Sequence, residues 1–115
     1  MITDLKYLQQ MTGNNDEMIA EMINLFLTQL SETRLEFKSL LDNKNWLELS
    51  RLAHKIKSSA LVMGVGSLVD EMKELEYLAK DAKDTEKYPD CIVRFDTMVD
   101  SIEIELKPFL NSMNC

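Results

Sequence analysis

The chain has 115 residues, 20 acidic and 13 basic, with a net charge of −7, 45% hydrophobic residues and 7% aromatic residues. The length predicts one domain over residues 1–115. The acidic balance argues against nucleic-acid and anionic-membrane partners, because both attract basic surfaces. Only three Gly and two Pro, among many Leu, Met, Glu and Lys, favour an all-helical fold. There is no signal-peptide pattern, membrane-length apolar run or closely spaced cysteine pair, so we expect a cytoplasmic protein.

Two helices are predicted in the first part of the chain. Thr3 can cap a short helix that ends near Gly13, and residues 14–17 offer caps and negative charge for a long second helix. Apolar residues of the second helix recur every three or four positions, apart from a weaker turn around Thr33 and Arg34. These apolar positions are Ile19, Met22, Ile23, Phe26, Leu30, Phe37, Leu40 and Leu41.

Residues 42–45 predict a tight connection to an antiparallel helix. Asn45 and Glu48 have the spacing of a capping box, and Trp46 is expected to enter the core. Gly64 is expected to end this third helix.

Two further helices complete the predicted fold. Ser67 should cap the fourth helix, whose buried positions are Leu68, Met72, Leu75 and Ala79. Residues 81–87 should form a polar loop, Pro89 fits the first turn of the last helix, and Pro108 should end or kink it near Lys107. Its apolar stripe is Ile92, Phe95, Val99, Ile102, Leu106 and Phe109. The predicted fold is an all-α, antiparallel up-down-up-down four-helix bundle with a short extra N-terminal helix.

The third helix carries the only histidine of the chain, His54. On a helical projection its apolar face consists of Leu49, Leu52, Ala53, Ile56, Ala60 and Met63, and His54 points away from that face. The neighbours of His54 one turn away are Ser50, Arg51, Lys57 and Ser58, with Leu47 and Leu61 two turns away. Arg51, Lys55 and Lys57 form a basic cluster in an acidic protein, which suits a phosphate group and an acidic partner pocket.

An exposed neutral imidazole can attack phosphorus without a separate base. The resulting phosphohistidine is an anion that Lys57 could reach, and the small Ser58 leaves room for a partner. Geometry alone also allows the simpler interpretation, in which a surface histidine has no function.

The sequence from Ala53 to Val65 resembles the signature of histidine-containing phosphotransfer (HPt) domains. In that family a histidine is followed by any residue, an aliphatic, Lys, Gly, Ser and a small residue, with an aliphatic and a Gly further along. The matching residues are His54, Ile56, Lys57, Ser59, Ala60, Met63 and Gly64. Ser58 departs from the pattern because it stands at the usual Gly position.

The resemblance implies a phosphorelay intermediate in which His54 accepts a phosphoryl group from a receiver-domain aspartate and passes it to another receiver. It also implies that Lys57 helps to hold that group, and that the protein is a phosphocarrier without kinase activity of its own. Receiver domains and a hybrid histidine kinase are the expected partners, with magnesium on the receiver and no cofactor on this chain. We expect a monomer that docks through Leu47 and Leu61, with Arg51, Lys55 and Ser58 beside the site.

Two alternatives remain from the sequence. One is a dimerisation and phosphoacceptor domain of a histidine kinase, although Ser58-Ser59 replaces the Thr-Pro of that signature. The other is an adaptor bundle in which His54 is incidental. One histidine and two distant cysteines leave no zinc, haem or di-iron motif. We interpret Glu71, Glu74 and Glu76 as a solvated helix face.

Overall fold

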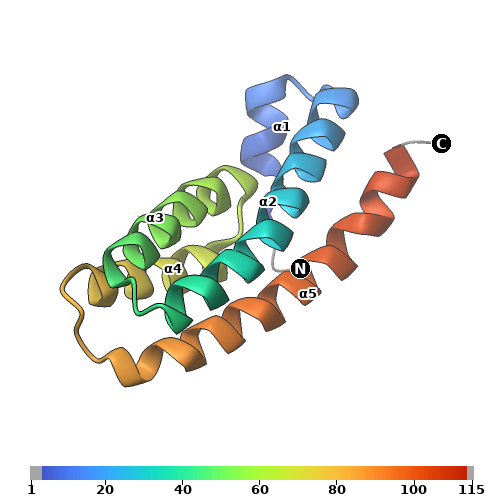
Figure 1. The fold of residues 1–115 in the computed structure, drawn as a ribbon. Helices are drawn as coiled ribbons and strands as arrows, with labels where there is room; N and C mark the ends of the chain where they lie inside the picture. The colour runs from blue at the N-terminus through green and yellow to red at the C-terminus, as the bar shows by residue number, and fades with distance from the viewer. Residues whose placement is uncertain (1–3, 114–115) are drawn as a thin grey trace.

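A computed structural model describes residues 4–113, which form five α-helices and no strand (Figure 1). The helices are α1 (Lys6–Thr12), α2 (Asp16–Asp42), α3 (Trp46–Met63), α4 (Gly66–Lys80) and α5 (Tyr88–Met113), with a short 3₁₀ turn η1 (Thr85–Lys87) before α5. The all-helical prediction is therefore confirmed for these residues. The predicted cap at Thr3 lies outside them.

The four long helices pack around one core. Each contacts two neighbours, α3 most extensively with α4 and α2 with both α3 and α5, and α5 closes the ring against α4. The short α1 lies across the ends of α2 and α3 (Figure 1). The bundle is elongated, about 45 × 21 × 20 Å, and its buried apolar side chains form one continuous cluster.

Two local signals act as predicted. The Asn15 side chain accepts a hydrogen bond from the Met18 N–H at 3.1 Å and caps α2. Gly64 ends α3 with a left-handed backbone, φ +71°. The Asp4 N–H donates to the Gly64 carbonyl at 2.8 Å, and a Cβ on Gly64 would lie 1.7 Å from the Asp4 oxygen. The backbone at Asp4, two residues before α1, therefore crosses the end of the histidine helix at a point where only glycine fits.

The predicted cap at Ser67 is wrong. The fourth helix begins one residue earlier, at Gly66, with Val65 as its N-cap residue. Val65 is fully buried, and its carbonyl accepts hydrogen bonds from the N–H groups of Leu68 and Val69. Burial of Val65 anchors the turn, so the helix starts without a polar side-chain cap.

The predicted capping box is also wrong. Asn45 is the N-cap residue of α3, but its side chain makes no capping hydrogen bond. The Glu48 carboxylate instead pairs with Arg51 one turn further along. Trp46 is partly buried and packs edge-on against the Tyr88 ring, with ring centroids 5.2 Å apart.

The weak turn of α2 is used for polar contacts with α5. The buried Thr33 hydroxyl donates to the Gln29 carbonyl at 2.7 Å. The Arg34 guanidinium binds the Asp96 carboxylate at 3.2 Å and the Asp100 carboxylate at 2.9 Å. These bonds link α2 to α5 where the apolar stripe is interrupted.

Pro108 was predicted to end or kink the last helix near Lys107, and the helix does not end there, because α5 continues through Pro108 to Met113. Proline removes the hydrogen bond to the carbonyl four residues earlier, here that of Ile104. Ile104 and Pro108 are exposed, so water can hydrate that carbonyl. The buried Leu106 and Leu110 on either side hold the helix on the bundle.

Candidate functional site

His54 lies on the solvent side of α3, with 60% of its side chain exposed. All six residues of the predicted apolar face are buried, which confirms the predicted orientation of the helix. The imidazole lines an open hollow of about 330 Å³ between α3 and α4. The other residues around this hollow are Leu47, Ser50, Arg51, Glu76 and Lys80. We call it the His54 hollow.

One imidazole nitrogen is held by a carboxylate from the neighbouring helix. His54 Nδ1 lies 2.6 Å from Glu76 Oε1, and Lys57 Nζ lies 2.7 Å from Glu76 Oε2. An ionised carboxylate can only accept hydrogen bonds, so Nδ1 must carry the proton in this contact. In a neutral ring the lone pair then resides on Nε2, for which residues 4–113 provide no hydrogen-bond partner. The contact with Glu76 therefore leaves Nε2 as the ring nitrogen with an available lone pair.

The same contacts with His54 and Lys57 stabilise the ionised form of the Glu76 carboxyl group. Partial burial favours the neutral acid, but hydrogen bonds and charge attraction from Lys57 and His54 outweigh it and lower the pKa of Glu76. The Glu76 and Lys57 side chains are 24% and 22% exposed, so the pair is only partly screened by water. At neutral pH the ring therefore faces a carboxylate ion.

Hydrogen bonds to the backbone fix the two helices at this point. The Ser50 hydroxyl donates to the Glu76 carbonyl at 2.9 Å, and Ser50 is 5% exposed. Ser50 lies beside His54 as predicted, since both line the His54 hollow, but it is buried because α4 packs over it. The Ser58 hydroxyl donates to the His54 carbonyl at 3.2 Å and stays at the surface.

The family of the chain follows from a comparison with protein-family models. The model described as "Hpt domain" matches residues 21–105, which include α3, α4 and most of α2 and α5. The chain belongs to the Hpt domain family. Comparisons with the curated proteins and with the solved structures return no match. An Hpt domain is a phosphotransfer intermediate of phosphorelays, a phosphocarrier that works with receiver domains and kinases.

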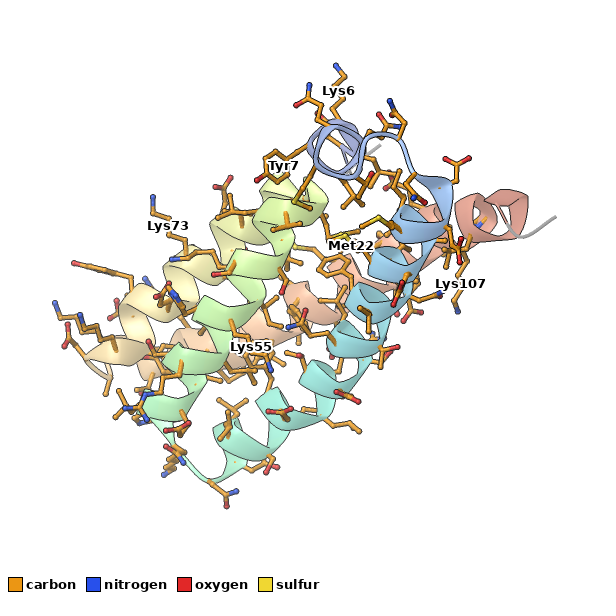
Figure 2. All side chains as sticks on the ribbon, turned by 90° about the horizontal axis from the view of Figure 1, so that it is seen from above. Lys6, Tyr7, Met22, Lys55, Lys73 and Lys107 are labelled. Atoms are coloured by element: carbon orange, nitrogen blue, oxygen red, sulfur yellow. The ribbon has the colours of Figure 1, made fainter. Side chains whose placement is uncertain are left out.

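The residues predicted to surround His54 in this Hpt domain and to dock its partner are brought together only in part. Leu47 and Arg51 line the His54 hollow, with Arg51 paired to Glu48. Lys55 instead lines a groove between α2 and α3, and Figure 2 shows it on the opposite side of α3 from Lys73. Leu61 is 58% exposed but lies beside Tyr7 at the α1 end of the bundle.

Two residues that line the His54 hollow of this Hpt domain were missed by the sequence prediction, Glu76 and Lys80. The interpretation of Glu71, Glu74 and Glu76 as a solvated face is wrong for Glu76 and also for Glu71, which binds Arg94 at 2.6 Å. A signal for Glu76 existed, because it stands four residues after the buried Met72 and three before the buried Ala79. A carboxylate at the margin of an apolar seam faces the neighbouring helix.

In the part of the Hpt chain that the structure describes, no group of three or more His, Cys, Asp or Glu side chains could hold a metal ion. No helix within it is long and apolar enough to cross a membrane.

Proposed function

We propose that His54 Nε2 accepts a phosphoryl group from the aspartyl phosphate of a receiver domain and passes it to the aspartate of a second receiver. The observation that carries this proposal is the contact of His54 Nδ1 with Glu76 at 2.6 Å on an exposed ring. This contact leaves the other nitrogen as the only basic atom of the imidazole.

The proposed step needs no proton transfer. The Nε2 lone pair attacks phosphorus, a bond between nitrogen and phosphorus forms, and the bond from phosphorus to the receiver carboxylate breaks. Because Nδ1 keeps its proton, the ring becomes positively charged, and the Glu76 carboxylate stabilises that charge across the 2.6 Å contact. The reverse reaction delivers the group to the second receiver, so the carrier returns unchanged.

We expect the receiver to carry the magnesium ion and the acidic pocket that neutralise and position the phosphoryl group. A hybrid histidine kinase is the expected source of phosphoryl groups, and the cytoplasm the expected compartment. Leu47 and Leu61, 51% and 58% exposed, are the proposed apolar contacts of docking, with Arg51, Lys55 and Ser58 around them.

The proposal takes the protein as a monomer with the antiparallel up-down-up-down helix order expected from the sequence. Since α2, α3, α4 and α5 close a core within one chain, no second copy is needed to bury it. The mass in solution by light scattering tests this point. A stable dimer would favour the kinase dimerisation domain instead.

The test of the proposed function is phosphotransfer from a panel of phosphorylated receivers, with His54→Gln as the control. We expect an acid-labile, base-stable label on the wild type and none on the variant. Label that persists on His54→Gln would contradict the role of His54. Receivers that bind both proteins equally without transferring phosphate would favour the adaptor alternative.

A further inference from the structure

Among the residues that the structure describes, one cation that lines the His54 hollow is paired with no carboxylate. Arg51 in the hollow is paired with Glu48, and Lys57 is paired with Glu76. The Lys80 ammonium lines the same hollow and has neither an ion pair nor a hydrogen bond to any residue of the described chain. Lys80 is therefore available to a ligand, whereas the other two cations are already occupied.

Its position on α4 directs Lys80 toward the histidine helix. Lys80 follows Glu76 by four residues, so both stand on the same face of α4 and both line the His54 hollow. Lys73 is exposed on the same helix but does not line this hollow. Of these two lysines of α4, Lys80 alone lines the His54 hollow.

A phosphoryl group on Nε2 changes the charge balance of the hollow. Glu76 and Lys57 neutralise each other on the Nδ1 side of the ring. The phosphoryl group adds a charge of about −1.5 to −2 at neutral pH on the opposite ring nitrogen. That charge needs a cation other than Lys57, because Lys57 is held by Glu76 at 2.7 Å.

We infer that Lys80 holds the phosphoryl group carried by His54, while Lys57 serves mainly to keep Glu76 in place. This inference rests on the proposed function of His54. The Lys80 ammonium donates hydrogen bonds to the phosphoryl oxygens as the bond from Nε2 to phosphorus forms, and it takes no part in proton transfer. The partner's own pocket is not needed for this contact.

A small donor separates this role from receiver docking. With phosphoramidate, Nε2 attacks phosphorus, the bond between phosphorus and the donor nitrogen breaks, and ammonia leaves. The proteins compared are the full chain as wild type, Lys80→Gln, Lys80→Arg and the matched control Lys73→Gln, which removes one charge from the same helix. Circular dichroism melting checks that all four remain folded, as expected for changes at exposed positions.

We expect Lys80→Gln to slow phosphorylation of His54 by about tenfold, the factor for one lost charge-assisted hydrogen bond of about 1.4 kcal/mol. Lys80→Arg should keep most of the rate, and Lys73→Gln all of it. A phosphorus NMR titration gives an independent readout that a merely structural role would not move. Without the Lys80 charge, the phosphoryl group should titrate about one pH unit higher.

Three results would overturn the inference. The first is a wild-type rate and titration in Lys80→Gln, which leaves His54 as phosphoacceptor and removes only the role of Lys80. The second is a defect of Lys80→Gln with receivers but not with phosphoramidate, because Lys80 would then be a docking residue. The third is a wild type that neither phosphoramidate nor any receiver labels, which overturns the proposed function itself.

Discussion

Replacing Glu76 with glutamine tests the idea that this residue sets the reactive state of His54. The carboxylate accepts hydrogen bonds from His54 Nδ1 at 2.6 Å and from Lys57 Nζ at 2.7 Å. An amide has one accepting oxygen and no charge, so it cannot hold both partners as strongly. The variant frees the imidazole to place its proton on Nε2, and it removes the charge that stabilises the ring during attack.

The magnitude follows from the exposure of the partners. A hydrogen bond to a charged group contributes about 1.5–3 kcal/mol when it is shielded from water. Because 60% of the His54 side chain is exposed, we take the low end of that range. The rate of phosphorylation by phosphoramidate should therefore fall by about tenfold in Glu76→Gln. Loss of the partly buried pair with Lys57 should also lower the free energy of unfolding by about 1–2 kcal/mol.

The assay combines rate and spectroscopy. The matched control is Glu74→Gln, which removes one charge from an exposed position on the same helix. Nitrogen NMR of the ring should report a proton on Nδ1 in the wild type and in Glu74→Gln, and a mixture of tautomers in Glu76→Gln. Phosphorylation of Glu76→Gln at the wild-type rate, or a wild type with its proton on Nε2, would refute the reasoning.

Three further predictions concern stability and docking. Gly64→Ala should lower the melting temperature, because φ is +71° at Gly64 and the new Cβ would meet the backbone of Asp4, at a cost of about 1–2 kcal/mol or more. The control Gly66→Ala should leave the melting temperature unchanged, because a Cβ there would meet no atom within 4 Å. Equal melting temperatures of the two variants would count against this account. Ala60→Trp should lower the free energy of unfolding by about 1–3 kcal/mol or more, because Ala60 is fully buried. Ser58→Trp, by contrast, should melt at the wild-type temperature but block phosphotransfer from receivers. Unchanged transfer in Ser58→Trp would contradict the proposed docking of receivers on this face of α3. Finally, the folded protein lowers the pKa of Glu76 below its unfolded value of about 4.3. The ionised Glu76 therefore stabilises the fold fully above about pH 4.3, and this stabilisation is lost as the pH falls through the pKa of the folded state. In chemical denaturation series, the stability difference between wild type and Glu76→Gln should shrink toward acid, and a difference independent of pH would exclude this linkage.

Much of the fold was predictable because helix signals are local. The repeat of apolar residues every three or four positions identified the buried face of α3 and hence the exposure of His54. Asn15 and Gly64 act through bonds within a few residues of the chain, and the structure confirms both. The signature around His54 is equally local, and the family match over residues 21–105 confirms the resemblance.

The errors fall where distant residues decide the outcome. Ser67 was a good cap by type, but burial of Val65 starts the helix earlier. Pro108 was a good helix end by type, but core contacts of Leu106 and Leu110 carry α5 past it. In both cases, tertiary packing outweighs a local preference of about 1–3 kcal/mol.

By itself, the sequence determined that the chain is helical, which helix carries the histidine and which side of that helix meets water. Only the tertiary structure decided which side chains meet His54, since Glu76 lies 22 residues away on another helix. Helical periodicity fixes the face on which a residue lies, but the pairing and rotation of two helices determine what that face touches. For this reason Ser50 is buried under α4, Lys57 is bound to Glu76, and Lys80 lines the His54 hollow without an ion pair to any residue that the structure describes.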